Sequence, residues 1–147
     1  MTETLETRLQ RIEDILEIQR LCHDYGQFLD AGDFEAYASL FAREGQVQLG
    51  PLGVARGPEE IRTMMENMLA GEIGQSYHII GSPRIDFESG DRARTEVMWT
   101  VIHRDEKDRP RLTMVGRHRD ILVREEGRWR FFRRRGYVDI PAGLPGK

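Results

Sequence analysis

The sequence has a single cysteine, Cys22, among its 147 residues. One cysteine cannot form a disulfide within the chain, and it cannot build a metal site that depends on several thiolates. Chains without disulfides are typical of reducing compartments, so a cytoplasmic location is expected.

Long apolar runs are also missing. No stretch approaches the roughly 20 consecutive apolar residues that a membrane-spanning helix needs. The N-terminal segment lacks the basic and apolar parts of a cleavable signal peptide, so none is expected. The net charge of −3 lacks the basic excess that is typical of nucleic-acid-binding domains. These absences predict a protein that binds neither membranes nor nucleic acids.

What is present fits one ordinary domain. A chain of 147 residues has the size of a single domain, and such a domain buries roughly two thirds of its unfolded surface. We therefore expect one domain over residues 1–147. The terminal segment PAGLPGK, residues 141–147, is expected to be a loose tail, as chain ends commonly are.

A long helix is predicted over residues 5–29, because apolar residues recur there at spacings of three and four. Gly32 follows it, as a glycine commonly does after a helix. The apolar side of this helix is formed by Leu5, Leu9, Ile12, Ile15, Leu16, Ile18, Cys22, Tyr25 and Leu29.

Two shorter helices and several strands follow. Asp33 is a good N-cap for a helix from Phe34 to Ala42, and Pro58 fits the first turn of a third helix. Strands are expected at residues 46–49, 77–88, 92–104, 111–124 and 128–140. Helices followed by long strands are typical of an α+β fold, with a curved, mostly antiparallel sheet wrapped against the helices.

Asp30 stands at the C-terminal end of the long helix, where the helix dipole disfavours a carboxylate by up to about 1 kcal/mol. Asp33 already caps the next helix, so Asp30 has no evident local role. One interpretation is a solvated residue, or one that binds the backbone of the turn. The other is a carboxylate that orients and stabilises an imidazolium. The sequence leaves both open.

Four histidines are candidates for that imidazole. His23 is expected on the helix surface, and His103 ends a strand before a charged loop. His78 lies in SYHIIGSPRI, among apolar neighbours. His118 shares a strand face with Met114 by alternation, which indicates a buried position or a pocket wall.

Five short motifs follow one another along nearly the whole chain: YGQFLDAGD at 25–33, GPEEI at 57–61, His78 with Pro83 and Ile85, GRHRD at 116–120, and EGRWRF at 126–131. Their order and spacing resemble the SnoaL-like family of the nuclear transport factor 2-like superfamily. The resemblance implies a cone-shaped α+β barrel, in which N-terminal helices pack against the curved sheet.

Enzymes of this family, among them scytalone dehydratase and bile acid 7α-dehydratase, pair an aspartate at the end of the first helix with a histidine on the first long strand. The resemblance thus implies that Asp30, His78 and Tyr25 are catalytic. Substrate contacts are expected from His118, Trp99, Met65 and Tyr137. Asp139 stands where the bile acid enzyme has an arginine, which leaves the substrate open.

Some of these residues also fit structural roles. Tyr25 and Trp99 are suited to the hydrophobic core. On a regular helix Tyr25 and Asp30 lie about 140° apart, so they reach one site only if the helix end unwinds or the pocket caps it. The basic stretch RFFRRR at Arg130–Arg135 divides between two faces of a strand, and it is interpreted as solvated or interfacial.

The implied chemistry is proton abstraction without a metal or an organic cofactor. His78 would be the base, Asp30 would hold its tautomer, and Tyr25 would donate a hydrogen bond to a developing oxyanion or a departing hydroxyl. The expected protein is a lyase or isomerase that dehydrates a hydrophobic substrate (steroid-like, aromatic or polyketide-like) or eliminates a leaving group from it. The alternatives are a non-catalytic module for ligand binding or dimerisation, and a polyketide cyclase-like enzyme. A homo-oligomer, dimer or trimer, is expected.

Overall fold

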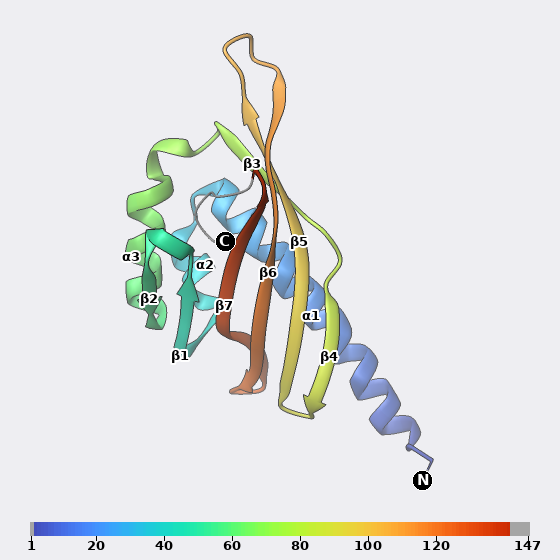
Figure 1. Ribbon diagram of the computed structural model, residues 1–147. Coiled ribbons are helices and arrows are strands. Elements are labelled where there is room, and N and C mark those ends of the chain that lie inside the picture. Colours follow the sequence, from blue (N-terminus) through green and yellow to red (C-terminus); the bar gives the residue numbers. More distant parts are fainter. Residues whose placement is uncertain (1, 142–147) are drawn as a thin grey trace.

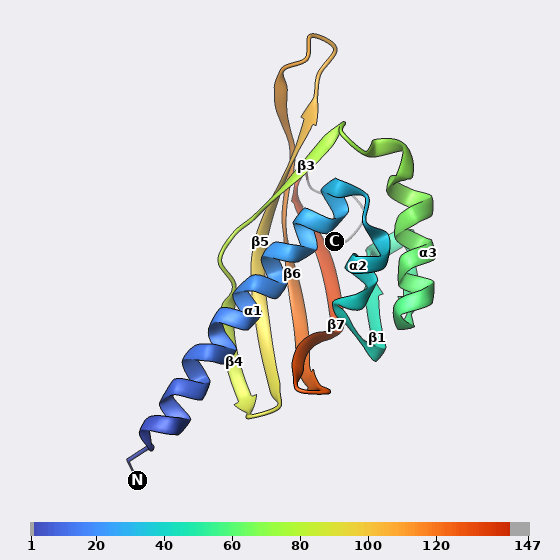
Figure 2. The ribbon, with the colours of Figure 1, turned by 180° about the vertical axis from the view of Figure 1, so that it is seen from behind.

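The computed structural model describes residues 2–141, so the predicted loose tail, apart from Pro141, lies outside the described residues. Helices cover one face of a curved sheet, and the other face is open (Figures 1 and 2). The helices are α1 (Leu5–Ala31), α2 (Phe34–Ser39) and α3 (Gly57–Leu69). The strands are β1 (Phe41–Gln48), β2 (Val54–Arg56), β3 (Ser76–Ile80), β4 (Arg84–Ser89), β5 (Arg92–Arg104), β6 (Pro110–Glu125) and β7 (Arg128–Ile140).

The sheet has the strand order β2-β1-β7-β6-β5-β3, and β4 also pairs with β5. The strand pairs are antiparallel except for β1 and β7, which run parallel. The α+β class with a curved, mostly antiparallel sheet is as predicted. The sheet is mixed, however, and it does not close into a barrel.

Helix α1 crosses the inner face of the sheet and runs past one end of it (Figures 1 and 2). The Thr4 side chain caps its start by accepting the N–H of Thr7, and Gly32 ends it with a left-handed backbone at φ 72°. Ile18, Cys22 and Tyr25 face the sheet and are buried.

One part of the predicted apolar side of this helix is not in the core. Leu5, Leu9, Ile12 and Leu16 are 78%, 54%, 54% and 60% exposed. The first half of α1 thus carries apolar residues on two sides, and a spacing of three and four cannot tell which side faces the sheet.

The segment after α2 differs from the prediction. A helix was expected up to Ala42, but α2 ends at Ser39 and β1 begins at Phe41. Phe41 pairs with Phe131 of β7, whose N–H donates to the Leu40 carbonyl oxygen at 2.9 Å. Pairing with a strand far along the chain therefore overrides the local helix signal. The short β2 lies in a region that was expected to be a loop.

The single strand predicted over residues 77–88 is divided in two. Residues 81–83, which connect β3 to β4, are not in a strand, although the Gly81 N–H still donates to the Met98 carbonyl oxygen at 2.8 Å. Both strands pair with β5, β3 with its second half and β4 with its first. Pro83 lacks the N–H that a ladder requires, which explains the interruption.

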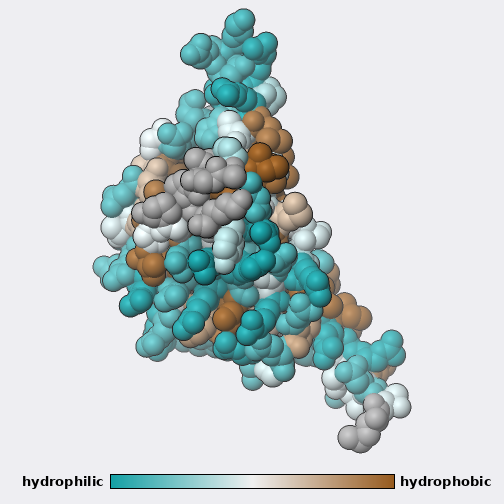
Figure 3. Space-filling view, in the orientation of Figure 1, coloured by the Kyte–Doolittle hydropathy of each residue, from teal (hydrophilic) through white to brown (hydrophobic). Residues whose placement is uncertain are grey.

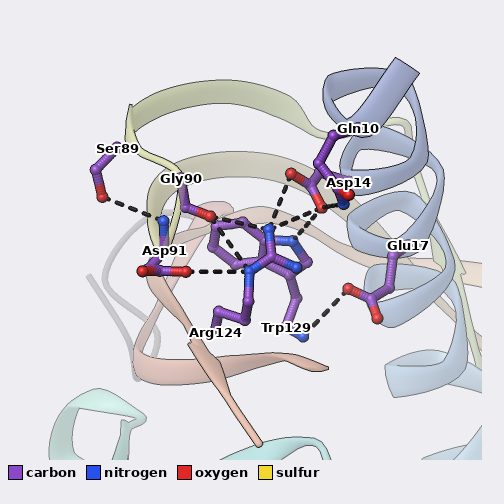
Figure 4. Close-up of polar contacts among 8 residues, drawn as sticks. All are labelled: Gln10, Asp14, Glu17, Ser89, Gly90, Asp91, Arg124 and Trp129. Atoms are coloured by element: carbon purple, nitrogen blue, oxygen red, sulfur yellow. Dashed lines mark hydrogen bonds and ion pairs between the residues drawn. The ribbon is translucent and has the colours of Figure 1, made fainter. Parts of the chain in front are cut away.

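A polar cluster fastens the N-terminal half of α1 to the sheet (Figure 4). The Asp14 carboxylate accepts hydrogen bonds from Arg124 at 2.9 and 3.0 Å and from Trp129 Nε1 at 3.0 Å. Arg124 also donates to the Gly90 carbonyl and to Asp91. Burial alone would raise the pKa of Asp14, but the hydrogen bonds from Trp129 and Arg124 outweigh it and leave the pKa below its ordinary value.

Strand β7 contains a bulge at Phe132. Leu122 of β6 pairs with Phe131, whereas the preceding Ile121 pairs with Arg133. A bulge adds one residue to one strand, so side chains beyond it point to the opposite faces from those that simple alternation predicts. Consequently Arg134 turns into the core and is 1% exposed, although its basic stretch was expected to be solvated or interfacial.

The same bulge places Tyr137 on the outer face of the sheet. There its ring contacts the guanidinium groups of Arg117, Arg119 and Arg135, whose Cζ atoms lie 5.0–5.8 Å from the ring centroid. This face is mostly hydrophilic over β6 and β7 (Figure 3). Along residues 2–141, no helix is long and apolar enough to cross a membrane.

Candidate active site

Asp30 and His78 form a close pair where the end of α1 meets β3. One Asp30 carboxylate oxygen lies 2.8 Å from His78 Nδ1. The same carboxylate accepts the backbone N–H of His78, at 3.0 and 3.2 Å from its two oxygens. Asp30 therefore fixes both the ring and the backbone of His78. Its carboxylate, at the end of α1, thus has hydrogen-bond donors on β3.

This geometry selects one tautomer of the imidazole. A carboxylate accepts hydrogen bonds, so the proton of a neutral His78 ring lies on Nδ1 and points to Asp30. The lone pair is then on Nε2, since the hydrogen bonds of His78 among residues 2–141 involve its backbone N–H and Nδ1. An imidazole held in this way is suited to accept a proton from a bound molecule.

His78 lines a cavity of about 210 Å³ between the helices and the sheet. Apolar side chains form most of its wall, and no Lys, Arg, Asp or Glu is among the described residues that line it. The larger wall residues are Leu29, Leu49, Met65, Met68, Trp99 and Val138. An apolar wall without charged side chains favours a neutral, hydrophobic ligand.

Tyr25 and His118 also line this cavity. The Tyr25 hydroxyl lies 3.5 Å from His118 Nε2, and the two rings pack edge to face with centroids 5.1 Å apart. Burial raises the pKa of the Tyr25 hydroxyl, so this group stays protonated and can donate a hydrogen bond.

A buried ion pair supports these two residues from behind. Arg134 donates to the Asp120 carboxylate at 2.8 and 3.0 Å, and neither side chain is exposed. Asp120 also accepts the Thr95 hydroxyl at 2.9 Å. The Arg134 guanidinium lies 4.1 Å from the centre of the Tyr25 ring. Tyr25 is therefore held between a fixed cation and the cavity.

His118 stays neutral in this setting. Burial lowers its pKa well below the ordinary value, and the positive charge of Arg134 lowers it further. Its Nδ1 has no hydrogen-bond partner among residues 2–141. Of the two histidines in the cavity, His78 is the one with a carboxylate that can stabilise its charged form.

A glycine allows α1 and β3 to approach each other. Gly26 lies one turn before Asp30, and a Cβ atom there would meet Ile80 Cγ1 at 2.8 Å. Real side chains do not come this close, so any larger residue would displace the Ile80 side chain or β3 itself. The missing side chain thus helps to bring His78 within reach of Asp30.

The structure brings together most of the predicted site residues. Tyr25, His78, His118, Trp99 and Met65 all line the cavity, and Asp30 holds His78 from behind. Tyr137 does not line it, because the bulge in β7 turns this residue to the outer face. Gly136 and Val138 take its place in the wall.

Sequence reasoning missed the Arg134–Asp120 pair. Its only signal was that Asp120 lies two residues after His118, on the strand face expected to be buried. Arg134 gave no such signal, because the bulge that turns it inward depends on the pairing of β6 with β7. Within residues 2–141, no group of three or more His, Cys, Asp or Glu side chains is arranged to hold a metal ion.

Comparisons with known proteins agree with this architecture. The pattern of the SnoaL-like domain matches residues 10–135. No curated protein matches the sequence. An NTF2-like protein with a cystatin-like fold from Novosphingobium aromaticivorans is 23% identical, with a TM-score of 0.87 over 95% of this chain and 90% of that one.

Two further solved structures are similar. A candidate scytalone dehydratase from Novosphingobium aromaticivorans is 27% identical, with a TM-score of 0.74 over 89% of this chain and 87% of that one. A type 2 hexachlorocyclohexane dehydrochlorinase is 20% identical, with a TM-score of 0.80 over 93% of this chain and 95% of that one. The likeness to the second of these shows a shared fold.

Proposed function

The chain belongs to the SnoaL-like family, and we propose that it is a lyase or isomerase that removes a proton from a small hydrophobic substrate. The observation that carries the proposal is the 2.8 Å contact between Asp30 and His78 Nδ1 beside an apolar cavity. Two of the similar solved structures are described as a scytalone dehydratase candidate and a dehydrochlorinase, which agrees with elimination chemistry.

The proposed reaction begins at His78 Nε2. This nitrogen takes a proton from a carbon next to a carbonyl, or next to a carbon that bears a leaving group. Asp30 stabilises the imidazolium that forms. The electrons of the broken C–H bond form a C=C bond while the leaving group departs. A departing hydroxyl takes the proton from His78 and leaves as water, which restores the neutral imidazole.

Tyr25 is proposed to act as a hydrogen-bond donor. Its protonated hydroxyl lies in the cavity wall, where it can stabilise an oxyanion or a departing hydroxyl. His118 contributes as a neutral wall residue, since its lowered pKa prevents it from carrying a proton near neutrality. No step in this scheme requires a metal or an organic cofactor.

The cavity limits the substrate. Its volume of about 210 Å³ is below the roughly 300–1,000 Å³ of drug-sized sites. Since no Lys or Arg is among the described residues of the wall, a carboxylate or phosphate would find no permanent cation there. We therefore propose a compact, neutral ring compound, such as a cyclic β-hydroxy ketone.

The test is proton exchange in deuterated water. Cyclic β-hydroxy ketones are incubated with the protein, and both deuterium uptake at the carbon next to the carbonyl and loss of water are followed. Replacing His78 by alanine should lower both rates by about 10²–10⁴-fold. His23→Ala, an exposed histidine on α1, is the matched control and should keep the wild-type rate.

Two outcomes would contradict the proposal. Equal rates for wild type and His78→Ala would remove His78 from the reaction. Binding of the ketones without any exchange would favour a ligand-binding module, which needs the apolar cavity but not the Asp30–His78 pair. A cyclase-like enzyme would show exchange without loss of water.

A further inference from the structure

The first half of α1 has an apolar stripe, formed by Leu5, Leu9, Ile12 and Leu16, that the rest of residues 2–141 leaves exposed. These residues are 54–78% exposed. With 100° between successive residues, the stripe lies opposite the face of α1 that packs on the sheet. Figure 2 shows that no other element lies over this side of the helix. A contiguous exposed patch of this kind marks an interaction surface more often than four scattered residues would.

The spacing in the stripe is four, three and four, which is the pattern of a seam between two helices. The next two positions in the pattern are Gln19 and His23, which are polar. The seam is therefore confined to the first turns of α1, towards the end that passes beyond the sheet (Figures 1 and 2). A partner helix can reach it there without contacting the cavity, which lies at the opposite end of α1.

The charges beside the stripe are different on its two flanks. Arg8 lies on one flank, and Glu6 and Glu13 lie on the other. Neither Arg8 nor Glu13 forms an ion pair within the described residues. The stripe thus combines an apolar seam with one basic and one acidic border.

These borders are complementary to those of an identical helix in one orientation only. In a parallel pair, the basic flank of each helix faces the acidic flank of the other, so Arg8 meets Glu13 of the second copy twice. In an antiparallel pair, like flanks face each other, and the glutamates repel. Two-fold symmetry of the parallel pair satisfies both charges on both chains.

We propose that the stripe is a self-association surface, at which two copies of this chain pair through parallel α1 helices. The bodies of the two copies lie on opposite sides of the seam, because the stripe faces away from the sheet. The occupant is a second copy rather than an unrelated peptide, since the charges of the stripe match those of its own sequence. This proposal does not depend on the reaction proposed above.

The first test is the mass of the full-length protein in solution, measured by sedimentation over a range of concentrations. The double variant Leu9→Gln, Ile12→Gln should form assemblies of half the wild-type mass, or weaken association at least tenfold. Both residues are exposed in the single chain, so the far-UV circular dichroism spectrum of the variant should match that of the wild type. The matched control is Met98→Gln, which changes an apolar residue with 63% exposure on the outer face of the sheet and should keep the wild-type mass.

The second test distinguishes the orientation. Arg8→Glu should weaken the pair, and adding Glu13→Arg to the same chain should restore it. A Leu9→Cys variant should form a disulfide-linked dimer, because equal positions meet in a parallel seam, while the buried Cys22 stays free.

Three results would overturn the proposal. A wild-type protein that is monomeric at all concentrations would show that the stripe does not bind a second copy, and would leave it to a different partner. An assembly that Met98→Gln disrupts and the stripe variant does not would place the interface on the sheet. Stronger association of Glu13→Arg alone would indicate an antiparallel pair.

Discussion

Asp14 and Asp30 belong to the same helix, and each accepts hydrogen bonds from residues on the sheet. Asp14 binds Arg124 and the indole of Trp129, two donors that keep their protons at every physiological pH. Asp30 binds a histidine, whose imidazole ring can both donate and accept a proton. The partner, and not the aspartate, therefore decides which end of the helix can do acid–base chemistry.

The surroundings of Asp14 and of Asp30 also differ in whether every polar group has a hydrogen-bond partner. The cluster at Asp14 lies where the β4–β5 turn meets the helix, and its donors are used up by fixed partners (Figure 4). At Asp30, only one ring nitrogen of His78 is hydrogen-bonded among residues 2–141, and the residue lines an apolar cavity. A fully satisfied cluster stabilises the fold, whereas a group left without a partner is available to a ligand.

The largest expected effect comes from replacing each of the two aspartates by asparagine in a separate variant. Asp30→Asn should lower the turnover of a ketone substrate by about 100-fold or more, because an amide no longer holds the Nδ1–H tautomer or stabilises the imidazolium. Asp14→Asn should leave turnover unchanged. The measurement is kcat/KM for both variants on one substrate. Equal losses in both variants would mean that Asp30 acts through stability alone.

The reverse pattern is expected for stability. Asp14→Ala removes hydrogen bonds from a guanidinium and an indole and leaves Arg124 and Trp129 with unsatisfied donors. We expect a loss of about 2–3 kcal/mol in the free energy of unfolding, measured by urea denaturation. Gln19→Ala, at an exposed position of the same helix, is the control and should stay within about 0.5 kcal/mol of wild type. A loss for Asp14→Ala no larger than that of the control would contradict the structural role.

Gly26 is also on α1, and its missing side chain allows α1 and β3 to approach each other. Its replacement therefore affects both stability and the contact between Asp30 and His78. In Gly26→Ala the helix gains about 1 kcal/mol, while displacement of Ile80 costs about 1–3 kcal/mol. The net loss of stability is then at most about 2 kcal/mol, but turnover should fall because His78 moves away from Asp30. Gly71→Ala, where a Cβ has nothing within 4 Å, is the control. Wild-type turnover in Gly26→Ala would show that the close approach is not needed.

The sequence predicts strands that are marked by local patterns, and it does not predict features that depend on pairing between distant segments. The strands β5 and β7 have the predicted bounds, because alternating residues and turn residues mark them locally. The placement of Asp30 beside His78 followed from resemblance to a family, since no local pattern joins a helix end to a distant strand. The bulge at Phe132 was missed because it exists only in the pairing of β6 with β7. That one residue decides the positions of both Arg134 and Tyr137.

The most gradual expected effect is a difference in pH dependence between His118 beside the cavity and Asp14 in the polar cluster. The folded pKa of His118 is well below 6.5, so the unfolded chain binds a proton that the folded chain does not. Stability should therefore fall as the pH drops below about 6.5, by at most about 1.4 kcal/mol per pH unit. Asp14 has a lowered pKa, so its contribution is present above pH 3.8 and is lost as the pH falls through its folded value.

The two windows can be separated by urea denaturation at a series of pH values. His118→Asn should flatten the curve between about pH 6.5 and 4.5 and leave the steeper fall at lower pH. Asp14→Asn should flatten only the part below about pH 4, because Arg124 and Trp129 do not titrate there. If His118→Asn has the same slope as wild type between pH 6.5 and 4.5, then His118 is protonated in the folded protein. Both histidines of the cavity would then be able to carry a proton, and the assignment of His78 as the base would rest on its contact with Asp30 alone.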